Sequence, residues 1–142
     1  MNKLIYLLLL SLSLSLNCDK SKTEPNSSEL SIKTDKTSYS QNEFVTFTIQ
    51  NATESNAFFT YCGPYLFFEI DKKHEGAWIN YLATVCPAIY AIANKELKAG
   101  SSIRDSTIFR DTGSYRFVIA FGWENKVEWN DSLVSNEFII HQ

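Results

Sequence analysis

The feature that most constrains this chain is a turn followed by a long alternating segment, at residues 111–121. Gly113 permits a sharp bend there, because a residue without a Cβ adopts backbone angles that other residues avoid. After the bend, an apolar residue occupies every second position: Tyr115, Phe117, Ile119 and Phe121. Residues at this period point to one face of a β-strand. The segment therefore predicts a turn and a half-buried strand, which is information about architecture rather than chemistry.

Short segments of the same kind follow one another along most of the chain, separated by polar turns. Further strands are predicted at residues 30–34, 43–50, 57–62, 65–71, 77–81, 103–110 and 133–141. Residues 84–94 are expected to form a loop or a short turn, because Pro87 interrupts the weak helical spacing of their apolar residues. Seven to nine short strands without a helix predict an all-β fold, either a sandwich or a barrel.

The first residues have the pattern of an export signal. A basic start at Lys3 precedes an apolar run of about 13 residues, whereas roughly 20 are needed to cross a bilayer as a helix. Residues 1–17 are therefore predicted to be a signal peptide. Residues 15–18 resemble the lipobox of bacterial lipoproteins, in which the cysteine, here Cys18, is acylated, although Ser15 and Asn17 differ from the usual residues. The alternative is a signal peptide cleaved nearby, with Cys18 an ordinary thiol.

A lipid anchor predicts where the protein resides. Two or more acyl chains hold a protein stably on a membrane, so we expect an exported protein at the outer membrane or cell surface rather than the inner membrane. Residues 18–29 would be the lipidated cysteine and a disordered tether, because residues 19–29 are polar apart from Pro25. Residues 30–142 remain for one domain. The formal net charge of −3, with no basic stripe, argues against a nucleic-acid partner.

The remaining cysteines, Cys62 and Cys86, form a pair once Cys18 is set aside. In an exported protein such a pair is expected to be oxidised to a disulfide. The alternative is two reduced, buried thiols. A zinc site is not expected, because no closely spaced group of cysteines and histidines is present.

The order of these signals resembles a family of bacterial immunoglobulin-like domains found in exported proteins and lipoproteins. The resemblance covers about residues 30–141 and includes the turn before Tyr115, which is similar to the tyrosine corner, where a tyrosine hydroxyl bonds to upstream backbone. Its other pieces are Thr37-x-Tyr39, Asn42-Glu43-x-Val45-x-Phe47-x-Ile49-x-Asn51, Phe67-x-Glu69, Gly76-x-Trp78, Leu97-x-Ala99-Gly100-Ser101 and Ser135-Asn136-Glu137-Phe138. It implies an immunoglobulin-like antiparallel β-sandwich that serves as a scaffold for binding or spacing, with no common enzymatic activity.

Candidate functional residues are aromatic. Phe58 and Tyr61 belong to a segment dense in aromatic residues, and Trp123 and Trp129 flank a turn. These four residues form a candidate binding surface, because exposed aromatic area marks interfaces. The alternatives are coverage of the aromatic strand face by residues 84–94, and a purely structural pairing of the two tryptophans.

No catalytic residue, metal ligand or cofactor site is predicted. The two histidines, His74 and His141, lie in a charged turn and next to the C-terminus, whereas a catalytic histidine must be buried and oriented. We therefore expect a non-catalytic binding module anchored to the cell envelope, with an unidentified protein as a possible partner. The alternative is a protease inhibitor of similar fold, for which an extended, exposed loop at residues 84–94, held by Cys86, would be the distinguishing feature.

Overall fold

A computed structural model describes residues 29–123, 125–127 and 131–142 of the chain. The described residues form twelve β-strands and no helix. The strands are β1 (Leu30–Thr34), β2 (Ser38–Ser40), β3 (Phe44–Asn51), β4 (Ala57–Cys62), β5 (Tyr65–Leu66), β6 (Glu69–His74), β7 (Ala77–Ala83), β8 (Ile92–Leu97), β9 (Ser102–Ile108), β10 (Gly113–Gly122), β11 (Ser132–Val134) and β12 (Phe138–His141). The predicted all-β class is confirmed.

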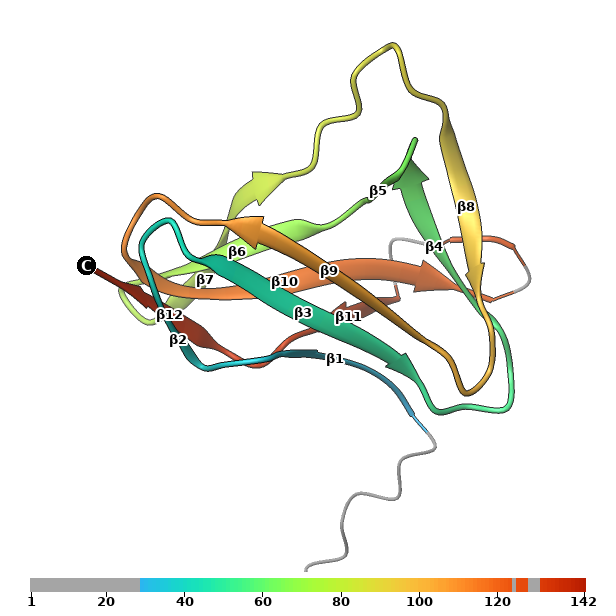
Figure 1. Ribbon diagram of the computed structural model, residues 1–142, viewed down its shortest axis with the longest axis horizontal. Helices are drawn as coiled ribbons and strands as arrows, with labels where there is room; N and C mark the ends of the chain where they lie inside the picture. Colours follow the sequence, from blue (N-terminus) through green and yellow to red (C-terminus); the bar gives the residue numbers. More distant parts are fainter. Residues whose placement is uncertain (1–28, 124, 128–130) are drawn as a thin grey trace, which may run out of the picture.

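The strands form two sheets that pack against each other (Figure 1). The smaller sheet has the order β1-β3-β9, with antiparallel pairing throughout. The larger sheet is built around β10 and contains the other nine strands of the described chain. Its β2–β12 pair is parallel, whereas the other pairs are antiparallel.

The long central strand β10 changes its partners along its length. Its first half pairs with β12 and β6, and its second half pairs with β11 and β4. The β6–β7 hairpin and the β4–β8 pair are therefore two separate branches of one sheet. The chain returns from β7 to β8 across the space between these branches (Figure 1). The branching at β10 thus determines where the connecting loop lies.

The core fills the space between the sheets and follows the period-two pattern of the sequence. Val45, Phe47 and Ile49 of β3 are fully buried, as are Tyr115 and Phe117 of β10. The rings of Phe47 and Phe117 lie 4.5 Å apart, centroid to centroid, and join the two sheets. Alternation places these side chains on one face of each strand, and burying that face is the main favourable contribution to folding.

The predicted bend and corner are present in the structure. Gly113 has a φ of +146°, which favours glycine. The hydroxyl of Tyr115 donates a hydrogen bond of 3.0 Å to the carbonyl oxygen of Asp111, four residues upstream. This bond fixes the chain direction at the entrance to β10 and is the contact that the sequence pattern predicted.

The number of strands is where the prediction was wrong, since the described residues form twelve strands rather than seven to nine. The expected strand at residues 133–141 is interrupted at Ser135, whose hydroxyl oxygen accepts the backbone N–H of Phe117 at 2.9 Å. The amide oxygen of Asn136 accepts the N–H of Thr34 at 2.9 Å. These side chains replace a regular ladder with bonds to both sheets, so β11 and β12 are separate.

Three further differences are local. Residues 92–94, expected to belong to a loop, lie in the strand β8. The strand expected at residues 65–71 is divided into β5 and β6 at Phe67 and Phe68. The strand β2 was not expected, because Tyr39 is its only buried residue and lies between two exposed serines. The predicted signal peptide, Cys18 and the tether up to residue 28 lie outside the described residues.

Candidate functional site

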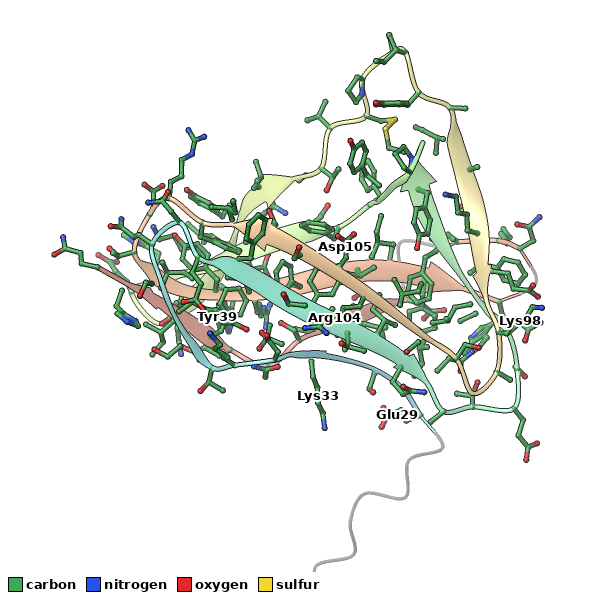
Figure 2. The ribbon with its side chains drawn as sticks, in the orientation of Figure 1. Glu29, Lys33, Tyr39, Lys98, Arg104 and Asp105 are labelled. Carbon is green, nitrogen blue, oxygen red and sulfur yellow. A yellow bond between two sulfur atoms is a disulfide. The ribbon has the colours of Figure 1, made fainter. Side chains whose placement is uncertain are left out.

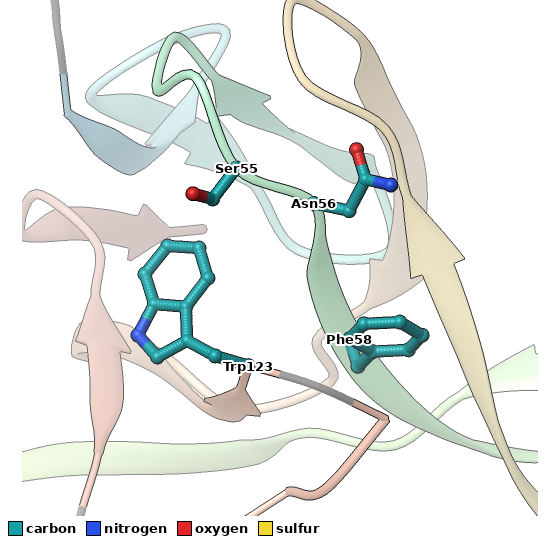
Figure 3. Close-up of a pocket in the computed structure, with 4 residues that line it drawn as sticks. All are labelled: Ser55, Asn56, Phe58 and Trp123. Carbon is teal, nitrogen blue, oxygen red and sulfur yellow. The ribbon is translucent and has the colours of Figure 1, made fainter.

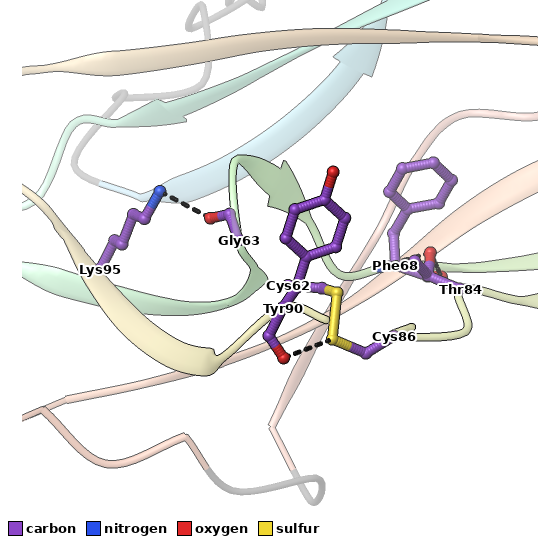
Figure 4. The surroundings of a disulfide bond; sticks show 7 residues. All are labelled: Cys62, Gly63, Phe68, Thr84, Cys86, Tyr90 and Lys95. Carbon is purple, nitrogen blue, oxygen red and sulfur yellow. Dashed lines mark hydrogen bonds between the residues drawn. A yellow bond between two sulfur atoms is a disulfide. The ribbon is translucent and has the colours of Figure 1, made fainter. Parts of the chain in front are cut away.

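The most distinctive feature of the surface is the segment of residues 84–91, which connects β7 to β8 and which we call the anchored loop. Cys86 in this loop forms a disulfide with Cys62 at the end of β4, and their Cα atoms are 5.4 Å apart (Figure 4). The predicted pairing of Cys62 with Cys86 is confirmed. The disulfide fixes the loop to the β4–β8 branch of the larger sheet.

Hydrogen bonds hold the beginning of the anchored loop. The backbone N–H of Thr84 donates to the carbonyl oxygen of Phe68 at 3.0 Å. The hydroxyl of Thr84 donates to the same oxygen at 2.7 Å and accepts the N–H of Phe68 at 3.2 Å. This reciprocal pairing extends the β6–β7 contact by one residue and fixes the direction in which the loop leaves the sheet.

Contacts with Gly63 and Tyr65 hold the end of the anchored loop. The N–H of Gly63 donates to the carbonyl oxygen of Ala91 at 3.0 Å. The ring of Tyr90 packs on Gly63, where a Cβ would lie 2.7 Å from the Tyr90 Cδ1 atom, and its centroid is 6.0 Å from that of Tyr65. Gly63 also has a φ of +58°, so glycine is favoured here by conformation and by space.

Between these fixed ends, the tip of the loop is apolar and exposed. It is a β-turn closed by a bond of 3.0 Å from the N–H of Tyr90 to the carbonyl oxygen of Pro87. Val85 and Ile89 have exposed fractions of 82% and 83%, and the neighbouring Ile92 of β8 has 65%. Loops with a rigid attachment and an exposed apolar tip are suited to recognition, because little conformational entropy is lost on binding.

The exposed apolar residues continue beside the loop. Tyr65 of β5 and Leu82 of β7 are also exposed. We call Tyr65, Leu82, Val85, Ile89 and Ile92 together the apolar loop surface. Coverage of the aromatic strand face by residues 84–94 is the alternative that the sequence leaves open to a binding surface. In the structure, the disulfide attaches the loop at the end of β4, and Val85 and Ile89 remain exposed.

Two of the predicted binding residues do lie together. Phe58 of β4 and Trp123, just beyond β10, line a pocket of about 340 Å³ with Ser55 and Asn56 (Figure 3). Phe58 pairs in the sheet with Gly122, the residue that precedes Trp123. Trp123 is 38% exposed and packs edge-on against Phe121.

Tyr61, the third predicted residue, lies on the opposite face of β4. It packs against the core, and the Nζ atom of Lys95 lies 4.3 Å from its ring centroid. Burial, and then the negative charge of Asp105, raise the pKa of the Tyr61 hydroxyl. The structure therefore does not join Tyr61 to the pocket of Phe58. The fourth residue, Trp129, lies outside the described residues.

Trp78, which is not among the candidate residues predicted from the sequence, lies beside two cations. The guanidinium carbon of Arg116 lies 4.5 Å from a Trp78 ring centroid, and the Nζ of Lys73 lies 5.3 Å from it. Arg116 also forms a salt bridge of 2.8 Å with Asp71. These contacts follow from the register of β6, β7 and β10, which no local pattern specifies. They make Trp78 part of a structural cation–π cluster.

Two acidic side chains of β6 have polar partners within the domain. Asp71 binds Arg116, and the Glu69 carboxylate accepts a hydrogen bond of 2.9 Å from Asn80. In residues 29–123, 125–127 and 131–142, there is no group of three or more histidine, cysteine or acidic side chains arranged to hold a metal ion. Within the same ranges, no helix has the length and apolar character required to cross a membrane.

Comparisons with known proteins identify no family for this chain. No protein-family model matches the sequence, and no curated protein matches it. Among solved structures, the chain is similar to the Pseudomonas fluorescens alkylpurine DNA glycosylase AlkC bound to DNA containing an abasic site analogue, with a TM-score of 0.36 and 16% identity. The match covers 81% of this chain and 31% of the glycosylase chain. A likeness at this level carries no argument about function.

Proposed function

We propose that this protein is a membrane-anchored lipoprotein whose single immunoglobulin-like domain is a non-catalytic module for binding another protein at the bacterial cell envelope. The observation that carries the proposal is the apolar loop surface. It is exposed, it contains three aliphatic side chains at or beside the loop tip, and it is fixed by a disulfide. Exposed apolar patches on a folded domain mark sites of interaction.

The position of the loop agrees with an anchor at Cys18. The described chain begins at Glu29, on the opposite side of the molecule from the anchored loop in the view of Figure 1. A domain tethered to a membrane through residues 18–29 can therefore present the loop toward the surroundings rather than toward the lipid. The hydrogen bond from Tyr115 to the Asp111 backbone supports the immunoglobulin-like character of the domain.

The experiment places a photo-crosslinking amino acid at position 89 in the full chain, expressed in its bacterial host. We expect a discrete crosslinked adduct, because a partner seated on the loop would contact this side chain. The matched control carries the same amino acid at position 139, since Ile139 is 49% exposed on β12 and lies outside the apolar loop surface. Equal crosslinking at both positions, or none at position 89, would contradict the proposal.

A second candidate function is protease inhibition through the same loop. The specific observation in its favour is that residues 84–87 are without regular structure and are held by the disulfide at Cys86. Holding an exposed segment rigidly lets it occupy a protease cleft at low entropic cost. Titration of representative serine, cysteine and metalloproteases tests it. Stoichiometric inhibition that is lost in the Cys62→Ser/Cys86→Ser variant supports this function, and absence of inhibition across the panel rejects it.

A further inference from the structure

A groove of about 460 Å³ lies beside the anchored loop, between β5, the end of β7 and β9. Its walls include Leu66 of β5, Phe68 just before β6, Leu82 of β7 and Val85 of the anchored loop. Leu82 and Val85 also belong to the apolar loop surface, so the groove and that surface are continuous. A partner bound on the loop would therefore cover the groove as well.

One wall of this apolar groove carries a carboxylate, that of Asp105. Asp105 is on β9, and it lies on the opposite side of that strand from Arg104 (Figure 2). Because side chains alternate along a strand, Asp105 shares its face with Ile103, which packs against the core. The carboxylate is half-buried in this position, whereas most acidic side chains point to solvent.

The charge of Asp105 is not neutralised by another side chain in the part of the chain that the structure describes. Among those residues, the salt bridges are Lys36–Glu43, Lys73–Glu137 and Arg116–Asp71. Within the described residues, the Asp105 carboxylate accepts the backbone N–H of its neighbour Ser106 at 2.7 Å. Lys95 points elsewhere, since its Nζ donates to the carbonyl oxygen of Gly63 at 3.1 Å and lies over the Tyr61 ring.

We propose that this groove receives a lysine or arginine side chain of the protein partner, with its alkyl stem on the apolar walls and its cation on the Asp105 carboxylate. Lysine and arginine combine an apolar stem with a charged head, which matches the groove. A charge-assisted hydrogen bond would form with the carboxylate. A purely apolar or acidic side chain would instead leave the carboxylate desolvated without a counter-charge. This inference rests on the proposed function and specifies what the partner presents.

The test measures which residues the full chain, in detergent, selects from a positional-scanning library of blocked hexapeptides. We expect peptides with lysine or arginine at one fixed position to bind at least tenfold better than those with glutamine there. Asp105→Asn should abolish this preference, and Asp105→Lys should shift it toward aspartate and glutamate. Glu54→Gln is the matched control, because it removes one exposed carboxylate in a turn outside the groove.

The outcomes separate this inference from the proposed function. A wild-type chain without a basic preference, or an Asp105→Asn variant that keeps it, overturns the inference. If either result is found while crosslinking at position 89 persists, the loop binds a partner but the groove does not select a basic side chain. If crosslinking at position 89 is absent, the proposed function fails independently. Thermal unfolding of each variant verifies that the domain remains folded.

Discussion

At the scale of single residues, two tyrosine hydroxyls hold the chain at its bends. Tyr115 donates to the backbone of Asp111, and Tyr39 donates to the side chain of Asp35 while accepting the N–H of Lys36 at 2.9 Å. Both rings are buried in the core. A buried hydroxyl requires a hydrogen-bond partner, because an unsatisfied polar group in the interior is costly. The partners found here are local in the sequence.

Tyr115→Phe is expected to lower the free energy of unfolding by about 1 kcal/mol, the usual net contribution of such a hydrogen bond. The ring remains and continues to pack against Phe109 and Phe138, so the core should not collapse. Denaturant unfolding of the wild type and the variant measures the difference. An unchanged midpoint would show that the corner bond makes no net contribution.

The ionisation of Tyr39 predicts a pH dependence of stability. Burial, followed by the bond to Asp35, raises the pKa of Tyr39 from an ordinary value of 10.0 to about 12. Above pH 10 the unfolded chain loses this proton while the folded chain retains it. The contribution of Tyr39 to the free energy of unfolding is therefore fully present below pH 10 and is lost between pH 10 and about 12.

This loss should be about 3 kcal/mol for a pKa raised from 10.0 to about 12, because a pKa difference of one is worth about 1.4 kcal/mol. Unfolding experiments across the alkaline range measure it, and Tyr39→Phe is the control because it removes the titrating hydroxyl. The variant should lose less stability than the wild type over this range. If the two curves run parallel, Tyr39 is not the group responsible.

At the scale of elements, the anchored loop depends on strands that are distant in sequence. Its ends are attached to β4 by the disulfide and to the start of β6 by Thr84. Because β4 and β6 pair with different halves of β10, the loop spans the fork in the larger sheet. The exposure of the loop is therefore a consequence of strand pairing, not of its own composition.

The Cys62→Ser/Cys86→Ser variant is expected to lose about 3 kcal/mol of unfolding free energy, the scale for a crosslink closing a loop of this length. The sequence separation of the two cysteines is 24 residues. Proteolysis should begin within residues 84–91, because these exposed residues lose one of their attachments. Denaturant unfolding and mapping of the first cleavage sites measure both effects. First cleavage elsewhere, with unchanged stability, would mean that the loop is held without the disulfide.

At the scale of the whole molecule, the proposed lipid anchor and the folded domain would have separate roles. The domain has a core of its own, made of residues from both sheets. The proposed anchor would determine the location of the protein, and the apolar loop surface would determine its partner.

Cys18→Ser is therefore expected to release the protein from the membrane fraction while leaving the domain folded. One acyl chain binds a membrane marginally and two or more bind stably, so loss of the acylated cysteine should give a large change in fractionation. Membrane separation followed by intact mass measurement tests this, with acyl mass expected only on the wild type. Identical fractionation and mass for both chains would contradict lipidation.

The sequence by itself determined the all-β class, most of the core, the corner bond of Tyr115 and the disulfide between Cys62 and Cys86. Alternation with period two is a local property of a chain, and burial of one strand face follows from it. A pair of cysteines, expected to be oxidised if the chain is exported, is likewise visible without a structure. Phe58 and Tyr61 are an odd number of residues apart in one strand, so alternation places them on opposite faces, although both were expected on one binding surface.

Only the tertiary structure decided which elements meet. The pairing of β2 with β12 joins Ser38 to Ile139 across almost the whole chain, and nothing local in either segment specifies it. The fork at β10, the exposure of Ile89 and the placement of Asp105 in the groove likewise depend on contacts between segments distant in sequence. Strand pairing is selected by the combined burial of all faces at once, and for that reason the candidate site became visible only in the folded chain.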